Sequence, residues 1–316
     1  MGKNVLITGI RGFVGTNLKN YLVENGNFEI TGSSRKKSSL MEMQSEISQI
    51  ASHSEVINSK SSFHSYIHLS GKVYDVKDKS NKKDYFTVNF GLTKQLFDQF
   101  VQDKKAETFI FISTIHVLTE NPDRVLDEAY EPEPFTPYGK SKFKAEKYIA
   151  ENCPPDKRYY ILRPTMIHGP GNKGNLNLLY GMVKKGIPYP IGAVNNKRSF
   201  VSVDNLSFII HEILKNDIES GLYHIADDEP TYTHDLIRMI ADLTGNKARI
   251  WNIPLPLLKI SAKIGNIVPF PLNEHRLVKL TGDFLVSNEK IKKAIGKPLP
   301  VNAKEGLEKT ISSFIK

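Results

Sequence analysis

The chain begins with an apolar run that leads directly into three closely spaced glycines. Residues 3–8 (KNVLIT) have the composition of a buried β-strand, and Gly9, Gly12 and Gly15 follow at GxxGxxG spacing. After Gly15, apolar residues recur at helical spacing as far as Asn25-Gly26, which predicts a helix. Glycines allow the backbone to approach a pyrophosphate, which then binds the amides of the helix N-terminus. The order of strand, turn and helix therefore predicts a dinucleotide-binding unit.

Further apolar runs alternate with helical patterns as far as about residue 164. Strands are expected at 28–32, 65–71 (with the turn that ends it), 109–114 and 159–164. Residues 38–60 are polar and weakly patterned, and no strand can be placed there. Alternation of this kind is typical of doubly wound sheets, in which ligands bind at the carboxyl ends of the strands. The predicted fold is α/β, a Rossmann-type doubly wound parallel sheet.

The regular alternation ends near residue 168. We expect residues 1–168 to form the cofactor-binding domain, with return segments at about 200–215 and 222–227. Residues 169–199 and 228–316 are expected to form a smaller, interleaved substrate-binding region.

The second predicted strand runs into hydroxyls and cations, at the place where an NAD site would have a carboxylate for the ribose. The segment Ser33-Ser34-Arg35-Lys36-Lys37 contains no acidic residue. Hydroxyls and cations suit a 2′-phosphate, so the segment favours NADP over NAD as the cofactor, with Ser34 and Arg35 as binding residues. A solvated basic loop is the alternative interpretation of the same residues.

Tyr138 and Lys142 are four residues apart in a predicted helix, so their side chains lie on one face. A neighbouring ammonium group favours the phenolate and is expected to lower the pKa of Tyr138, which eases proton exchange. An ordinary exposed helix can have the same spacing. The spacing of Tyr138 and Lys142 alone therefore does not indicate catalysis, and the other motifs of the chain decide between the two interpretations.

The order of these segments resembles the extended short-chain dehydrogenase/reductases. The motifs that carry the resemblance are Thr8-Gly9-x-x-Gly12-Phe13-x-Gly15, Leu69-Ser70-Gly71, Asn89, Ser113-Thr114 and Tyr138-Gly-x-Ser141-Lys142-x-x-Ala145-Glu146. The resemblance covers essentially the whole chain and implies a bound nicotinamide cofactor and a nucleotide-sugar substrate. Residues 162–164, 169–175 and 198–206 further resemble the UDP-sugar 4-epimerase-like subgroup, which includes 4-ketoreductases of bacterial surface-polysaccharide synthesis.

The resemblance implies a role for each residue of the catalytic set. Tyr138 is the general acid and base, Lys142 binds the nicotinamide ribose and lowers the pKa of Tyr138, and Thr114 orients the reacting oxygen. Ser113 is the neighbour most easily confused with Thr114. The implied cofactor contacts are Gly9, Gly12, Phe13, Val14, Gly15, Ser34, Arg35, Leu69, Ser70, Gly71, Asn89, Ser113, Tyr138, Lys142 and Pro164.

The substrate is expected to contact Thr114 and residues of the C-terminal half. Arg198 could pair with a pyrophosphate, because a planar guanidinium suits that group. Lys173 and Asn175 are further candidates, for which a solvated loop is an equally good interpretation. The substrate-contacting Asn and Arg of the epimerase pattern are replaced by Met166 and Leu280, which leaves that part of the substrate site open.

Two reactions fit the catalytic set. Dehydratases place an acid pair after the Thr, and Ile115-His116 stand there instead, so a 4,6-dehydratase is disfavoured. The basic Arg35 segment suits an exchangeable NADPH, which favours reduction of a UDP-4-keto-hexose or hexosamine at C4. The alternative is a UDP-hexose or hexosamine 4-epimerase that holds NAD tightly. A non-catalytic, cofactor-sensing protein would be expected to lack the tyrosine or the lysine.

Net charge, hydropathy and residue spacing limit the kinds of partner that the chain is expected to bind. The formal net charge is +9, but the chain has no arginine-rich arm or helix-turn-helix pattern, so no nucleic-acid partner is expected. No apolar run reaches membrane-spanning length, so no stable membrane insertion is expected. The stretch 253–272 is interpreted as core or subunit contact, with a membrane-surface role as the alternative. The nine histidines show no metal-ligand spacing, and no metal site is predicted.

Two further observations concern location and assembly. The chain has one cysteine, Cys153, and no signal-peptide pattern, which is typical of a cytoplasmic protein in a reducing compartment. The family resemblance suggests a homodimer built on the helices that carry Asn89 and Tyr138.

Overall fold

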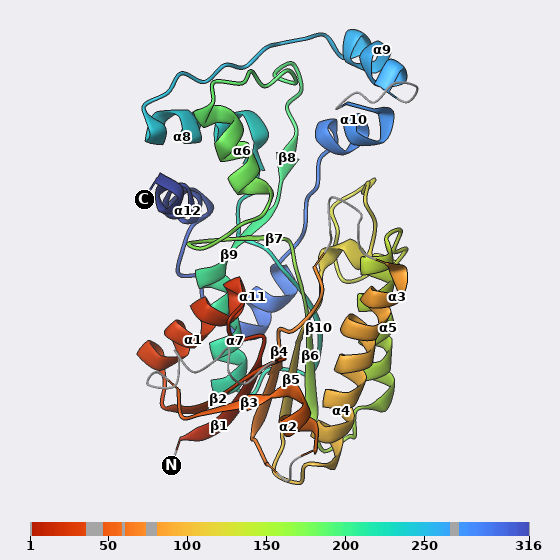
Figure 1. Ribbon diagram of the computed structural model, residues 1–316, viewed down its shortest axis with the longest axis vertical. Helices are drawn as coiled ribbons and strands as arrows, with labels where there is room; N and C mark the ends of the chain where they lie inside the picture. Colours follow the sequence, from red (N-terminus) through yellow and green to blue (C-terminus); the bar gives the residue numbers. More distant parts are fainter. Residues whose placement is uncertain (1, 36–46, 59–60, 74–80, 266–271, 316) are drawn as a thin grey trace.

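The computed structural model of the chain describes residues 2–35, 47–58, 61–73, 81–265 and 272–315. Lys36 and Lys37 of the predicted basic segment, and residues 266–271 of the apolar stretch, lie outside these ranges. The chain is arranged along one long axis, with a β-sheet and its helices at one end and a helical cap at the other (Figure 1). No helix within the described ranges is long and apolar enough to cross a membrane.

A parallel sheet of seven strands forms the first of these two parts. Its order is β10-β6-β5-β4-β1-β2-β3, and every neighbouring pair is parallel. The bounds are β1 (Lys3–Thr8), β2 (Phe28–Ser34), β3 (Gln49–Ser52), β4 (Ser65–His68), β5 (Thr108–Ile112), β6 (Arg158–Pro164) and β10 (Gly221–Ile225). This order is the Rossmann arrangement, extended by one strand. The predicted doubly wound parallel sheet is confirmed.

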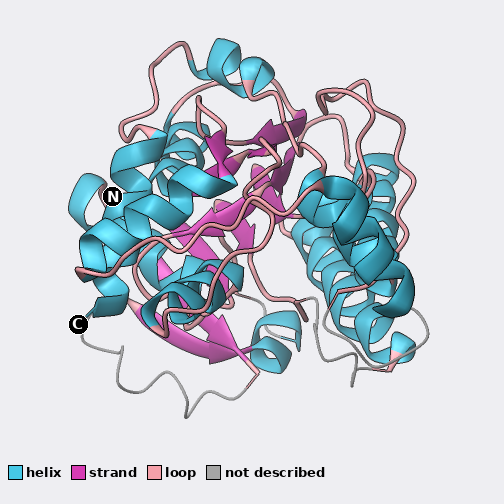
Figure 2. Cartoon of the chain, turned by 90° about the horizontal axis from the view of Figure 1, so that it is seen from above, coloured by secondary structure: helices cyan, strands magenta, loops and turns pink. Residues whose placement is uncertain are grey.

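Strand β1 shows why apolar runs form the middle of the sheet. Val5 and Ile7 pack in the same core as Leu18, whereas Leu6 packs with Phe109 on the other face. Successive side chains of a strand point to opposite faces, so a strand that is apolar at every position is buried on both sides. Helices accordingly lie on both sides of the sheet (Figure 2).

The two helical layers come from different parts of the chain. One layer consists of α1 (Phe13–Asn25), α7 (Val203–Lys215) and α11 (Glu289–Ile295), and the other of α4 (Leu92–Gln102) and α5 (Pro137–Asn152). Shorter elements are α2 (His53–Asn58), α3 (Lys82–Tyr85), the π-helix η2 (Phe86–Gly91) and the 3₁₀ turn η3 (Ile115–Val117). The chain thus returns twice to the sheet after it has first left it.

The helical cap has a core of its own. Its elements are α6 (Asn175–Lys184), α8 (Thr233–Thr244), α9 (Leu255–Gly265), α10 (Glu274–Thr281), α12 (Ala303–Ile315) and the short strands β7 (Met166–His168), β8 (Lys197–Arg198), β9 (Phe200–Ser202) and β11 (Thr231–Tyr232). Leu176, Ile237, Leu258 and Leu307 are buried together there. Buried His168 joins the cap to the sheet, because its ring nitrogens lie 2.9 Å from Thr310 Oγ1 and 3.3 Å from Asp227 Oδ2.

Candidate active site

The glycine-rich turn follows β1 and opens helix α1. Gly9 has a φ of 72°, which favours glycine, and its carbonyl accepts a hydrogen bond from the Gly12 amide at 2.9 Å. A Cβ on Gly15 would lie 2.4 Å from the Gly9 carbonyl oxygen, so the close approach of helix and turn requires glycine here. No side chain caps α1, and its first turn has no acidic residue. The helix N-terminus therefore suits the pyrophosphate of a dinucleotide.

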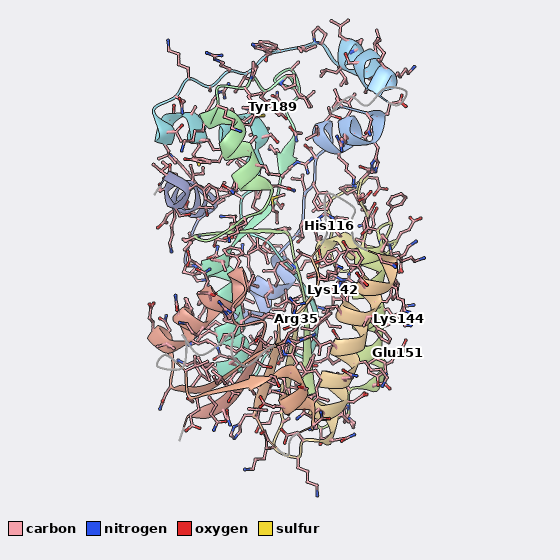
Figure 3. All side chains as sticks on the ribbon, viewed as in Figure 1. Arg35, His116, Lys142, Lys144, Glu151 and Tyr189 are labelled. Carbon is pink, nitrogen blue, oxygen red and sulfur yellow. The ribbon has the colours of Figure 1, made fainter. Side chains whose placement is uncertain are left out.

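The carboxyl ends of β2 and β4 are joined by a histidine at the start of α2. His53 Nδ1 lies 2.7 Å from Ser33 Oγ, and His53 Nε2 lies 3.1 Å from Ser70 Oγ. Burial lowers the pKa of His53, and the charge of Arg35 lowers it further. Ser34 ends β2 and exposed Arg35 follows it (Figure 3). This end of the sheet is lined by hydroxyls, an imidazole and a cation.

Helix α5 brings Tyr138 and Lys142 to the carboxyl end of β5. Thr136 caps the helix by accepting a hydrogen bond from the Gly139 amide at 3.0 Å, and Pro137 occupies the first turn. Lys142 Nζ donates to the Ile112 carbonyl at 2.9 Å. Thr114 follows two residues later and is hydrogen-bonded to Tyr138. The structure therefore brings together all three residues of the predicted catalytic set.

The pKa values within this set differ from the expected direction. Burial raises the pKa of Tyr138 to about 12, and only the hydrogen bond from Thr114 opposes it. Burial also lowers the pKa of Lys142 to about 8, against the effect of Glu146. The expectation that Lys142 lowers the pKa of Tyr138 is wrong for this structure. The physical reason is that burial penalises the charged phenolate, while the Lys142 ammonium group donates its hydrogen bond to the Ile112 carbonyl.

Asn89 holds the turn after β4 beside Lys142. Its side-chain amide donates to the Lys72 carbonyl and to Ser141 Oγ, each at 3.0 Å, and accepts from the Lys72 amide at 2.7 Å. A Cβ on Gly71 would lie 3.1 Å from Asn89 Oδ1 and 3.2 Å from Lys142 Nζ. Asn89 belongs to the π-helix η2, and such wide turns often mark functional sites. Asn89 and Gly71 thus lie at the predicted cofactor side of Lys142.

A second histidine, His68, supports the turn after β4 from the buried interior of the domain. His68 is fully buried, and its ring nitrogens lie 2.7 Å from Thr8 Oγ1 and 2.9 Å from Thr93 Oγ1. Burial, together with the charges of Lys142 and His53, holds its pKa well below the usual range, so the ring is neutral. Ser70 donates its backbone amide to Thr8 Oγ1 at 3.3 Å. His68 therefore connects β1, β4 and α4 beneath the predicted contacts Leu69 and Ser70.

Two further predicted contacts stand at the ends of neighbouring strands. Ser113 donates its amide to the Leu162 carbonyl at 2.7 Å, but its buried hydroxyl has no hydrogen-bond partner. Pro164 ends β6, opposite Ile225 of β10. A buried hydroxyl without a partner is rare in native proteins, and a bound ligand would supply one. Together with the Gly15 turn, this residue set fits a dinucleotide cofactor.

Arg198 and His116 are near enough for the Arg198 charge to act on the His116 imidazole. Arg198 donates to the Lys279 carbonyl, and the His116 ring lies 5.8 Å from that of Phe284. Desolvation of the ring by the surrounding protein lowers the pKa of His116. The charge of Glu120 opposes this shift, and the charges of Lys279 and Arg198 add to it. Arg198 thus stands within electrostatic reach of the turn that follows Thr114.

Lys173 and Asn175 lie elsewhere, on the side of the glycine-rich turn. Both are exposed, and they flank Gly174 at the start of α6. The preceding loop packs on α1, because Asn17 donates to the Pro170 carbonyl at 3.3 Å. The structure therefore does not bring these two residues together with Arg198 by any contact that it describes.

Sequence analysis did not find His53 or His68. His53 lies in the segment 38–60, where no pattern could be recognised, and its partners are Ser33 and Ser70 from two other strands. His68 stands inside a predicted strand, where an apolar context hides its polar contacts. The only available signal was a histidine at or near a strand end.

Comparisons with known proteins agree with this geometry. The family model described as "NAD dependent epimerase/dehydratase family" matches residues 5–226. A UDP-glucose 4-epimerase from Vibrio cholerae is 28% identical over 100% of this chain and 96% of its own length. An N-acetyl-alpha-D-glucosaminyl-diphospho-ditrans,octacis-undecaprenol 4-epimerase from Escherichia coli O157:H7 is 27% identical, over 93% of this chain and 86% of its own.

Solved structures show the same fold. UDP-glucuronic acid 4-epimerase from Bacillus cereus in complex with NAD has a TM-score of 0.76 at 19% identity, over 99% of this chain and 98% of its own. UDP-glucose 4-epimerase from Thermotoga maritima has a TM-score of 0.78 at 19% identity, again over 99% and 98%. The matched motifs, the strand order and the family model point to one conclusion: this chain belongs to the NAD dependent epimerase/dehydratase family and is an enzyme.

Proposed function

We propose that this enzyme reduces a UDP-4-keto-hexose or UDP-4-keto-hexosamine at C4, with NADPH as the cofactor and Tyr138 as the proton donor. The observation that carries the proposal is the meeting of Thr114, Tyr138 and Lys142 at the carboxyl end of β5, together with a cation and no carboxylate at the carboxyl end of β2. The pKa of Tyr138, about 12, keeps the phenol protonated at neutral pH, and Thr114 is hydrogen-bonded to it. A protonated phenol can act as the acid that reduction of a carbonyl requires.

The cofactor would be held by the residues at the carboxyl ends of the strands. Gly9, Gly12, Phe13, Val14 and Gly15 form the pyrophosphate turn, Ser34 and Arg35 face the adenosine ribose, and Leu69, Ser70, Gly71, Asn89, Ser113, Lys142 and Pro164 line the nicotinamide side. A bound nicotinamide supplies or accepts a hydride, so the protein's own task is to position the sugar and to handle its proton.

Proton transfer is carried out by Tyr138, with Thr114 and Lys142 beside it. As negative charge develops on the C4 oxygen, Tyr138 donates its proton there and Thr114 donates a second hydrogen bond to the same oxygen. Lys142 would bind the nicotinamide ribose through its ammonium group, from the same helix face as Tyr138. The Ile112 carbonyl holds that ammonium group in place.

Substrate contacts complete the proposal. Arg198 is the partner for the diphosphate, since it stands near the turn after Thr114 and its guanidinium can bind two oxygens at once. Lys173 and Asn175 are secondary contacts, and residues 169–199 and 228–316 form the substrate-binding region. The NAD and UDP-sugar complexes among the neighbours support a nucleotide-sugar substrate.

The preference for NADP rests on the end of β2. Ser33 is bound to His53, Ser34 and Arg35 follow, and residues 28–35 hold their one carboxylate at Glu29, near the other end of the strand. This surface suits a 2′-phosphate better than a ribose hydroxyl. The neighbours that bind NAD support the alternative cofactor.

A second candidate function is a 4-epimerase that holds NAD tightly. The two relatives described above are 4-epimerases, one of a UDP-sugar and one of a lipid-linked diphospho-sugar. The same Thr114, Tyr138 and Lys142 would serve it, and the fate of the hydride separates the two reactions. Within either reading, we place the enzyme in the cytoplasm, as a homodimer that supplies surface-polysaccharide precursors. The single Cys153 and the subgroup resemblance support this placement.

One experiment separates the candidates. Nucleotides released from the purified enzyme by heat are identified by mass spectrometry, and the enzyme is then mixed with NADPH and, in separate reactions, a UDP-4-keto-hexose and a UDP-4-keto-hexosamine. A reductase consumes NADPH and the sugar in equal amounts. An epimerase releases NAD on heating and interconverts UDP-hexosamines without added cofactor. Absence of both activities overturns the proposal.

A further inference from the structure

Helix α9 presents an apolar stripe to solvent. Leu257, Ile260 and Ile264 are 54%, 57% and 54% exposed. Their spacing of three and four residues places them on one side of the helix. We call these three side chains the α9 stripe. Large aliphatic side chains in a row are uncommon on a free surface, so the α9 stripe calls for an occupant.

The exposure is a stable property of the fold. On the opposite side of α9, Leu258 and Ala262 are 3% and 0% exposed and belong to the buried core of the cap. The helix is therefore anchored by one side while the other faces outward. Figure 1 shows α9 at the far end of the cap, away from the sheet. This position leaves the α9 stripe accessible to a large flat partner.

Helix α9 itself carries cations and no carboxylate. Residues 247–265 contain four cations, Lys247, Arg249, Lys259 and Lys263, and no carboxylate. Lys259 and Lys263 are exposed and project next to the stripe, one turn apart. In the described part of the chain neither lysine takes part in an ion pair, so both charges are available to an external anion. Lysines of this kind can bury their stems while the ammonium groups reach phosphates.

We propose that α9 docks this enzyme on the surface of an anionic lipid bilayer. The α9 stripe would enter the boundary between headgroups and acyl chains, and Lys259 and Lys263 would contact the lipid phosphates. The helix has 11 residues and would lie in the plane of the surface, since a span needs about 20. This inference does not depend on the proposed reaction.

A second copy of the chain fits the α9 stripe less well. Stable protein interfaces bury roughly 1,200–2,000 Å² in total, far more than three side chains can supply. In a symmetric contact the same patch meets itself, which would bring the lysines of both copies together. An anionic surface instead meets these lysines with opposite charge.

Vesicle sedimentation of the full chain tests the proposal. The vesicles contain equal parts of phosphatidylcholine and phosphatidylglycerol, and vesicles of phosphatidylcholine alone serve for comparison. We expect binding to the anionic vesicles that is about tenfold or more tighter than to the neutral ones and that weakens in high salt. The double variant Ile260→Glu/Ile264→Glu should lose this binding. Leu178→Glu changes an aliphatic residue of α6 that is 66% exposed and should bind like the parent.

Further measurements distinguish loss of membrane binding from instability of a variant and from contact with a second copy. Lys259→Glu/Lys263→Glu alters only exposed charges and should abolish the difference between the two vesicle types even if the first variant is unstable. Cofactor binding should be unchanged in both variants, which separates this test from that of the proposed function. Equal vesicle binding by parent and variants overturns the proposal. The proposal is also overturned if the parent binds no vesicles and is a dimer by light scattering, while the Ile260→Glu/Ile264→Glu variant is a monomer. In that case α9 would bind a second copy.

Discussion

Lys142 Nζ donates a hydrogen bond to the carbonyl oxygen of Ile112, across 2.9 Å. Ile112 is the last residue of β5, so this bond ties the first turns of α5 to the strand end from which Thr114 follows. Tyr138 lies one turn before Lys142 and is thereby placed beside Thr114. The geometry of the proton donor is therefore set by backbone, before any ligand binds.

Replacing Tyr138 by Phe removes the proposed proton donor and leaves the ring in place. We expect turnover to fall by about 10²–10⁴-fold, while the dissociation constant of the cofactor changes little. Single-turnover kinetics and a fluorescence titration with NADPH measure the two quantities. Tyr148→Phe is the matched control on the same helix, because that hydroxyl bonds Asp98 instead of Thr114. An undiminished rate in Tyr138→Phe contradicts the mechanism.

The rate should fall as the pH rises above about 8. Burial lowers the pKa of Lys142 from 10.5 to about 8, so its ammonium charge, and with it the charge-assisted contact to the nicotinamide ribose, is lost in that range. Tyr138 stays protonated, since its pKa is about 12. The pH profile of kcat/KM for 4-keto reduction checks this, and Lys142→Met should be slow with no inflection near pH 8. A rate that rises through pH 8 would instead indicate a base.

Unfolding does not explain such a fall. The unfolded lysine keeps its proton up to about pH 10.4, so between the two pKa values the unfolded state binds more protons than the folded one. Stability therefore rises with pH in this window as far as Lys142 contributes. The rate and the stability should change in opposite directions.

Sequence patterns were sufficient for those parts of the fold whose signals are local. The apolar run before Gly9 and the spacing from Gly9 to Gly15 determine a strand, a turn and a helix within about 25 residues. By contrast, β3 has four residues, none of which is fully buried, so it has no apolar pattern to recognise. His53 follows it directly and was missed for the same reason.

The pKa shifts in the candidate site could be derived only from the three-dimensional structure. The four-residue spacing of Tyr138 and Lys142 indicates a shared helix face, but it does not reveal that Lys142 is buried and Tyr138 partly buried. Burial determines the sign of both pKa shifts. Likewise the contact of Arg198 with the Lys279 carbonyl joins residues 81 positions apart, which no local pattern contains.

Gly15→Ala should weaken cofactor binding. The added Cβ would lie 2.4 Å from the Gly9 carbonyl oxygen and 2.6 Å from Ile10 Cα, and backbone atoms cannot move aside without shifting the turn. We expect the dissociation constant of NADPH to rise about tenfold or more. Gly181→Ala in α6 is the control, because no atom beyond its chain neighbours and the backbone of its own helix would lie within 4 Å of the added Cβ. That variant should gain about 0.5–1 kcal/mol of stability. Equal cofactor affinity in both would contradict the assignment of the turn.

Arg35→Glu tests the choice between NADP and NAD. A carboxylate at this position repels a 2′-phosphate and can accept hydrogen bonds from ribose hydroxyls. We expect affinity for NADPH to fall about tenfold or more, as for loss of a charge-assisted hydrogen bond of about 1.5–3 kcal/mol, while affinity for NADH is kept. Calorimetric titration with both cofactors measures the change. Lys104→Glu alters an exposed cation next to the amino end of β5 and should affect neither cofactor. Equal losses for both cofactors would argue against a 2′-phosphate site.

Glu146→Ala should strongly destabilise the fold. The Arg163 guanidinium donates to both carboxylate oxygens of Glu146, at 2.7 to 3.2 Å, and the two side chains are 4% and 3% exposed. Removing one partner leaves a buried charge without compensation, so we expect a loss of about 3–5 kcal/mol in the free energy of unfolding. Urea denaturation of the cofactor-free enzyme measures it. Glu308→Ala breaks the exposed pair with Lys304 and should cost less than about 0.5 kcal/mol. Similar small losses in both variants would show that water reaches Arg163, because a hydrated guanidinium does not need its carboxylate.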